Sequence, residues 1–202
     1  TTFTANVSED YTVVVTDPLD ATTCNETSLP VTVIINPSPT AEIETTDLEY
    51  CAGETGVTLE ATAVAGATYS WKAVSDDSEQ STTNPSSLLL AGDYYVDVTL
   101  SGCTETSAEV TVIENELPLS TIEDGATFCS ENLSTEELTV TMTEGDLPFT
   151  VTYTDAANLS QILNITSGTT GSITGLTTGD YTLTKVTDAN GCYTDLTETS
   201  TI

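Results

Sequence analysis

Five cysteines, two lysines and 32 acidic residues are the side chains of this sequence that could take part in chemistry, and histidine is absent. Without histidine, the usual general base of a Ser–His–Asp triad is missing. Lys72 and Lys185 stand singly on strand-like segments, which does not favour a lysine nucleophile. The many carboxylates are not accompanied by aromatic residues that would line a glycoside-binding cleft. We therefore expect no enzymatic activity.

The cysteines also lack the spacing of a metal or redox site. Cys51 and Cys103 are 52 residues apart, Cys129 and Cys192 are 63 apart, and no C-x-x-C motif occurs. Zinc is therefore not expected, and no basic neighbour lowers the pKa of a thiol. The sequence "DANG" (188–191) lacks the later ligand positions and the distal glutamate of an EF-hand loop. Calcium remains an option on the acidic composition alone.

The charge balance excludes several classes of partner. Two basic residues against 32 acidic ones give a formal charge of −30, which repels nucleic acid and anionic membrane surfaces. No apolar run reaches the roughly 18 residues of a membrane-spanning helix. No basic and apolar signal peptide is visible, so we interpret the sequence as a mature product or an internal part of a longer chain. The acidic, threonine-rich and cysteine-bearing composition indicates an extracellular, cell-surface protein.

The sequence repeats itself, which tells us how these residues are arranged along the chain. Tyr11, Tyr94 and Tyr181 each follow an acidic residue, and they are 83 and 87 residues apart. "VTVIINPSP" (31–39) matches "VTVIENELP" (110–118) at a constant offset of 79. The repeat therefore predicts the end of one unit and two whole units.

We name these parts the N-terminal segment (1–37), the middle segment (38–116) and the C-terminal segment (117–202). Proline-bearing stretches separate them, at 36–40 (the first joint) and 116–119 (the second joint). Their short, stiff composition favours a semi-rigid string of units over a flexible tether.

Within a unit the pattern is typical of β-strands. Alternating or β-branched runs are separated by clusters of Gly, Asn, Asp and Pro, and no segment has a helical period. The predicted strands are "VTLEATA" (57–63), "TYSWKAV" (68–74), "YYVDVTL" (94–100), "AEVTVI" (108–113) and "PFTVTYT" (148–154). Several short strands in about 80 residues predict an all-β chain of tandem antiparallel immunoglobulin-like β-sandwich repeats.

That fold assigns structural roles to four aromatic residues. Trp71 would lie on the third strand and pack between the sheets. Tyr11, Tyr94 and Tyr181 would each form a tyrosine corner, with a buried ring and a hydroxyl bonded to nearby backbone. We expect all four in the core.

The repeat also accounts for the odd number of cysteines. Each full unit has one cysteine before its second strand and one at its last hairpin, which predicts the pairs Cys51–Cys103 and Cys129–Cys192. Each would close a loop that contributes about 3–4 kcal/mol. Cys24 would be the second member of a pair whose first cysteine lies upstream of residue 1. A simple sandwich leaves one alternative open, because its first and last hairpins lie at opposite ends and Cys51 would then approach Cys192. A turn at 45–47, or at Asp124-Gly125 in the last unit, that folds the first strand back would restore the pairs within one unit.

Three stretches carry a family resemblance: "EYCAGETGVTLEATAVAGATYSW", "AGDYYVDVTLSGC" and "LTKVTDANGC". They resemble the immunoglobulin-like repeats of giant surface proteins of Bacteroidota, which include gliding-motility adhesins exported by the type IX secretion system. The resemblance implies an extracellular stalk or filament for cell adhesion, without catalytic residues.

The function expected from these observations is a non-catalytic stalk segment whose partners are neighbouring repeats. Two alternatives remain open. In the first, the chain is a filament subunit and residues 1–37 complete a sandwich in another copy by strand addition. In the second, the chain is a module whose hairpin loops bind a surface glycan or protein.

Overall fold

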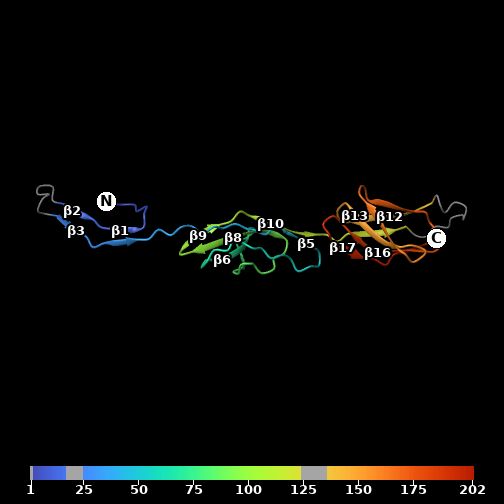
Figure 1. Cartoon of the computed structure of the whole chain (residues 1–202), viewed down its shortest axis with the longest axis horizontal. Coiled ribbons are helices and arrows are strands. Elements are labelled where there is room, and N and C mark those ends of the chain that lie inside the picture. Colours follow the sequence, from blue (N-terminus) through green and yellow to red (C-terminus); the bar gives the residue numbers. More distant parts are fainter. Residues whose placement is uncertain (1, 17–24, 124–135) are drawn as a thin grey trace.

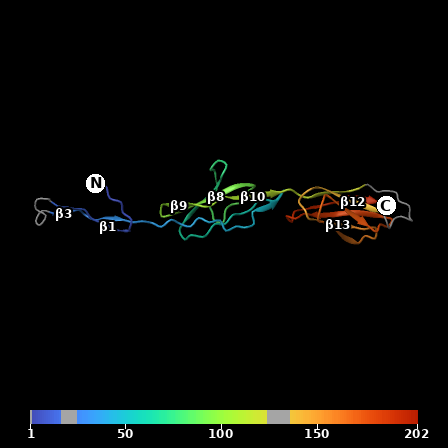
Figure 2. The same ribbon diagram turned by 90° about the horizontal axis from the view of Figure 1, so that it is seen from above.

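The computed structural model describes residues 2–16, 25–123 and 136–202 of this chain. The three segments follow one another along the long axis of an elongated molecule, in both views (Figures 1 and 2). All regular structure in these ranges is β, which confirms the all-β class predicted from the strand pattern. Across the same ranges, no helix is long and apolar enough to cross a membrane.

The N-terminal segment consists of two separate two-stranded antiparallel sheets. β1 pairs with β4, and β2 pairs with β3. Their bounds are Glu9–Tyr11 (β1), Val14–Thr16 (β2), Asn25–Thr27 (β3) and Val31–Val33 (β4). Most of the large apolar side chains of this segment are exposed, because no second layer of described residues covers them.

The middle segment folds around one core, which contains Trp71. Its sheet has the order β5-β10-β8-β6-β7, and β9 pairs with β8. The bounds are Glu49–Cys51 (β5), Thr68–Ala73 (β6), Glu79–Ser81 (β7), Gly92–Leu100 (β8), Cys103–Thr106 (β9) and Val110–Asn115 (β10). Isolated antiparallel bridges join Ile43 to Ala61 and Val57 to Leu89. Leu59, Ala61 and Leu89 from this bridged layer are buried in one cluster with side chains of the sheet.

The C-terminal segment has two sheets that contribute to a second core. One has the order β11-β12-β15, and the other has the order β14-β13-β16-β17, with β18 also paired to β16. The bounds are Leu119–Ile122 (β11), Glu137–Glu144 (β12), Phe149–Thr154 (β13), Ser160–Ile165 (β14), Thr170–Thr174 (β15), Asp180–Thr187 (β16), Tyr193–Asp195 (β17) and Thr199–Thr201 (β18). Alternate residues of β12 and β13 point into this core, as expected for sheets with one buried face.

The three repeated tyrosines make the same local contact. Each hydroxyl donates to the backbone carbonyl oxygen four residues earlier, at 3.0 Å from Tyr11 to Val7 and 3.0 Å from Tyr94 to Leu90. The Tyr181 hydroxyl lies 3.4 Å from the Thr177 carbonyl oxygen. This bond holds each ring against the turn that precedes its strand. It also gives the hydroxyl a hydrogen-bond partner where the ring is buried.

The four aromatic residues expected in the core do not all lie there. Trp71 is fully buried and its indole N–H donates to the Thr83 carbonyl oxygen at 2.9 Å, and Tyr94 and Tyr181 are also buried. Tyr11 is half-exposed, with Phe3 as its aromatic neighbour at 5.2 Å between ring centroids. The expectation that Tyr11 is a core residue is therefore wrong for the described structure, because its sheet has only two strands and no facing layer.

The predicted disulfide pairs within one unit are also wrong. Cys51 is bonded to Cys192, which is 141 residues away and belongs to the next segment. The predicted pair Cys51–Cys103 therefore does not form, and Cys103 is a free thiol. Cys129 lies outside the described residues, and its predicted partner Cys192 is occupied by Cys51.

The course of the chain after the first joint explains this pairing. Residues 42–44 bond with residues 60–62 in the bridged layer, and residue 48 then bonds to β10 of the other sheet. β5 continues parallel to β10, with Cys51 opposite Asn115, the residue just before the second joint. The chain thus changes sheets near residues 45–47 and does not fold back. β5, which ends at Cys51, and β9, which begins at Cys103, therefore lie at opposite ends of the segment (Figure 1).

Candidate functional site at the second joint

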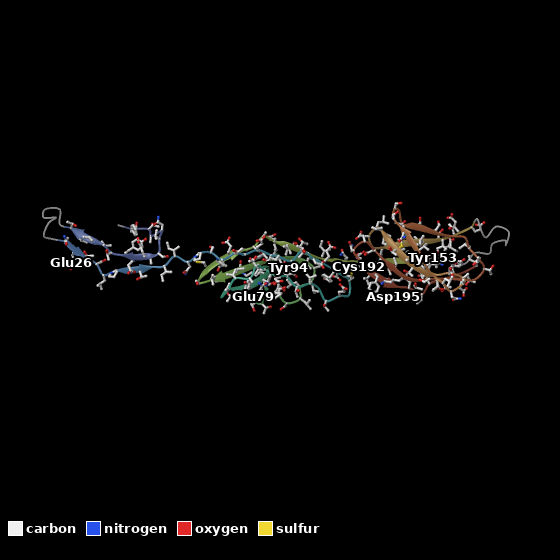
Figure 3. All side chains as sticks on the ribbon, in the orientation of Figure 1. Glu26, Glu79, Tyr94, Tyr153, Cys192 and Asp195 are labelled. Atoms are coloured by element: carbon white, nitrogen blue, oxygen red, sulfur yellow. A yellow bond between two sulfur atoms is a disulfide. The ribbon has the colours of Figure 1, made fainter. Side chains whose placement is uncertain are left out.

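Two of the four cysteines predicted to form disulfides, Cys51 and Cys192, come together at the second joint. Two elements place the sulfur atoms there. β5 brings Cys51 to the end of the middle segment, and the hairpin between β16 and β17 brings Cys192 from the C-terminal segment. Their Cα atoms are 5.5 Å apart, within the range of a disulfide. Cys192 lies at the boundary between the two segments in Figure 3.

Cys51 is held by backbone and side-chain hydrogen bonds around a tight turn. The Ala52 N–H donates to the Asn115 carbonyl oxygen at 2.8 Å, which extends the parallel ladder past the cysteine. The Cys51 N–H donates to Glu54 Oε2 at 3.0 Å. Gly53 has φ of 88°, a conformation that glycine adopts without steric cost. The sequence "CAGE" therefore forms a closed turn that fixes the sulfur at the joint.

Cys192 is held by the turn "DANG" (188–191), the sequence compared above with an EF-hand loop. Asp188 Oδ1 accepts hydrogen bonds from the backbone N–H groups of Asn190 and Cys192, both at 3.0 Å. Gly191 has φ of 81° and completes the turn. The Asp188 side chain thus satisfies the backbone of its own hairpin, an arrangement that aspartate favours in turns. Asp188 was not among the predicted site residues, although it lies only three residues before Gly191-Cys192.

Two surface hollows flank the disulfide. One of about 400 Å³ is lined by the 51–54 turn, Leu117 and residues 191–195. The other, of about 470 Å³, lies along β5 and includes Asn190. Within the described ranges no group of three metal-ligating residues occurs, at this joint or elsewhere. The arrangement is a covalent connection between segments, and its polar groups serve the two turns that carry the cysteines.

The two lysines each have a structural partner. Lys72 Nζ lies 2.7 Å from Asp97 Oδ2 on the neighbouring strand, and Lys185 Nζ lies 3.8 Å from the centroid of the Tyr193 ring. The hydrogen bond to Asp97, together with its charge, raises the pKa of Lys72, so the amine stays protonated and is a poor nucleophile.

Replacing Lys72 by methionine should raise the pKa of the Asp97 carboxyl. Partial burial acts to raise this pKa, but hydrogen bonds from Lys72 and Thr106 and the lysine charge outweigh it, so the pKa lies below its ordinary value. The pair therefore stabilises the fold at pH above the ordinary carboxyl pKa, and this contribution is lost as pH falls through the lowered one. In Lys72→Met this contribution is largely absent, so the acid-induced loss of stability that comes from Asp97 should become smaller.

An NMR titration of the Asp97 carboxyl carbon measures this shift. Lys185→Met is the matched control, because it removes the other lysine and leaves the Asp97 contacts intact. An Asp97 pKa that is the same in Lys72→Met and in the original protein would contradict the assignment of the shift to Lys72.

Comparison with known proteins adds no relative to this description. No protein-family model matches the chain, and a search of the curated proteins finds no match.

Proposed function

We propose that this protein is a non-catalytic structural segment of a long extracellular stalk or surface filament involved in cell adhesion, built from tandem immunoglobulin-like β-sandwich repeats. The observation that carries the proposal is the Cys51–Cys192 disulfide, which joins two consecutive segments across the second joint. A bond at this place keeps the segments end to end under tension, when noncovalent contacts at a joint would separate.

The recurrence of the same strand pairing supports the repeat. Tyr94 lies opposite Val110 and Asp93 opposite Thr111 in the middle segment. The equivalent residues of the N-terminal segment have the same register, with Tyr11 opposite Val31 and Asp10 opposite Thr32. In both aspartate–threonine pairs the threonine hydroxyl donates to the aspartate carboxylate, at 2.5 Å from Thr32 and 2.6 Å from Thr111. The C-terminal segment has the same hydrogen bond, from Thr201 to Asp180 at 2.7 Å. Stacked units of one kind extend a protein by contacts between neighbours only.

Two further properties agree with a place outside the cell. Disulfides persist in oxidising compartments and are rare in the cytosol. The formal charge of −30 keeps parallel fibres apart and favours solubility in a salty exterior, where it is screened.

Antibodies raised against residues 38–202 test this function directly on the source cells. We expect immunogold labels on thin fibres that project from intact cells. Labelling confined to the cell interior would contradict the proposal. A glycan array probed with the complete 202-residue protein separates the stalk from the binding-module alternative, because strong and selective binding to one glycan would favour the latter.

A further inference from the structure

The N-terminal segment matches the second half of the middle segment, contact by contact. Beyond the shared register of β1–β4 and β8–β10, a serine makes the same pair of hydrogen bonds in both. Ser28 Oγ accepts from the Val13 N–H at 2.9 Å, and Ser107 Oγ accepts from the Val96 N–H at 3.0 Å. Each of these hydroxyls also donates to the carbonyl oxygen of the following residue. β1 and β2 together are thus the counterpart of β8, and β3 and β4 are the counterparts of β9 and β10.

The matching residues differ greatly in exposure. Val13 is 65% exposed, and its counterpart Val96 is completely buried. Val15 is 66% exposed, and its counterpart Val98 is also completely buried. In the middle segment these valines pack against Leu59, Ala61 and the other residues of the first half of the unit. The N-terminal segment therefore has a core-type face that no described residue covers, and exposed apolar faces of this kind mark contact surfaces.

Among the described residues, the first joint has a counterpart of Cys192 but no counterpart of Cys51. Cys103 is the first residue of the hairpin strand β9, and Cys192 directly precedes β17, the hairpin strand of the next segment. The Cys103 Sγ lies 3.6 Å from the Asn36 carbonyl oxygen. The Asn36 side-chain amide donates to the Ser101 carbonyl oxygen at 2.9 Å. Asn115, which is 79 residues after Asn36, is the residue that lies opposite Cys51 at the second joint.

We propose that Cys103 forms a second inter-segment disulfide, with a cysteine on a strand that pairs in parallel with residues 34–36. This strand belongs to a half-unit of the same type as residues 38–85, which covers the exposed face of the N-terminal segment. The two thiols give up two electrons and two protons to an oxidised dithiol of an oxidising compartment, which is reduced in the exchange. The inference rests on the proposed tandem arrangement. Two observations support the proposed disulfide. Cys103 corresponds to Cys192, which is bonded to Cys51, and the core-type side chains of Val13 and Val15 are exposed.

The half-unit is continuous in the chain with the N-terminal segment. The Tyr94 hydroxyl bonds to the carbonyl oxygen of Leu90, and the chain before Leu90 is the last part of the half-unit that packs on β8. The Tyr11 hydroxyl makes the same bond to Val7, so the chain approaches β1 through the same corner. A half-unit joined ahead of this corner needs no rearrangement, whereas the half-unit of a second copy is already occupied by its own β8 and β10.

Such a disulfide would interlock the three segments. Cys103 lies between Cys51 and Cys192 in the sequence, so the loops closed by the two disulfides overlap. A force that separates the segments at one joint would then also act on the loop closed by the disulfide at the other joint.

The test is an extended protein in which a copy of residues 38–85 is joined to residue 3 of the complete chain. This join reproduces the distance between residue 85 and Tyr94, because Phe3 is the counterpart of Ser86. Peptide mapping under non-reducing conditions should find the added cysteine bonded to Cys103, and Cys103 should lose its reaction with a maleimide. Cysteine to serine in the added copy is the matched control, and there the reaction of Cys103 should return.

Three other results would overturn the proposal. Hydrogen exchange that protects Val13 and Val15 while Cys103 stays reactive would reject the disulfide and leave the tandem arrangement intact. An added half-unit that protects neither valine would count against both. A Cys103 disulfide that forms only when residues 38–85 are supplied as a separate polypeptide would reject the continuous chain as the source.

Discussion

Stretching a single molecule between its two ends should give a maximum extension that grows by about 500 Å when the Cys51–Cys192 disulfide is reduced. The disulfide passes the force directly from residue 51 to residue 192, so the chain between them is not extended even when it unfolds. Cys51 and Cys192 are 141 residues apart in the sequence, and each residue between them adds about 3.5 Å when the chain is fully extended. Optical tweezers or an atomic force microscope measures the contour length with and without reductant.

Two variants separate this disulfide from other effects of the reductant. The double variant Cys51→Ser, Cys192→Ser should show the long extension without reductant, because the connection is absent. Cys103→Ser removes a free thiol and should keep the short extension of the oxidised protein. Equal extensions for the oxidised protein and the double variant would show that the bond does not join the segments.

Leu59→Ala should destabilise the middle segment by about 2–5 kcal/mol, the range for truncating a fully buried leucine. Leu59 is completely buried, and it belongs to the same core cluster as Trp71. The loss combines the apolar transfer energy with the cavity that the missing methyl groups leave. Trp71 is the one tryptophan of the chain, so its fluorescence follows the unfolding of this segment alone during a urea titration.

Leu88→Ala is the matched control, because it makes the same substitution at a side chain that is 56% exposed. A change within about 0.5 kcal/mol is expected there, as for surface substitutions in general. The backbone hydrogen bonds between Leu59 and Ser86 do not involve the leucine side chain, so they remain in Leu59→Ala. Similar urea midpoints for the two variants would contradict the assignment of Leu59 to the core.

Under the proposed function, the position of the disulfide matters more than its contribution to folding. A bond within one unit would protect that unit alone from extension. The bond from β5 to the following hairpin instead lets tension pass between segments while most of the intervening chain stays folded. A stalk built in this way keeps its length when individual units unfold.

Much of the strand pattern was predictable from local sequence. The predicted strand at 94–100 lies within β8, and the prediction for 148–154 matches β13. Both have alternating or β-branched side chains whose burial follows the two-residue period. The prediction of a regular strand over 57–63 was wrong, since only isolated bridges form there. Leu59 bonds to the Ser86 side chain as well as to its backbone, and this contact replaces a regular ladder.

The sequence alone therefore determined that the chain is all-β and that the same tyrosine turn occurs three times. These features depend on residues close together in the chain, where side-chain period and turn chemistry act. Tertiary structure decided which sulfur atoms meet and which tyrosine ring stays half-exposed. Cys51 reaches Cys192 because its strand changes sheets and continues to the far end of the segment, and Tyr11 lacks a facing layer. Such outcomes depend on the path of the chain and on neighbouring segments, which the local pattern of residues does not encode.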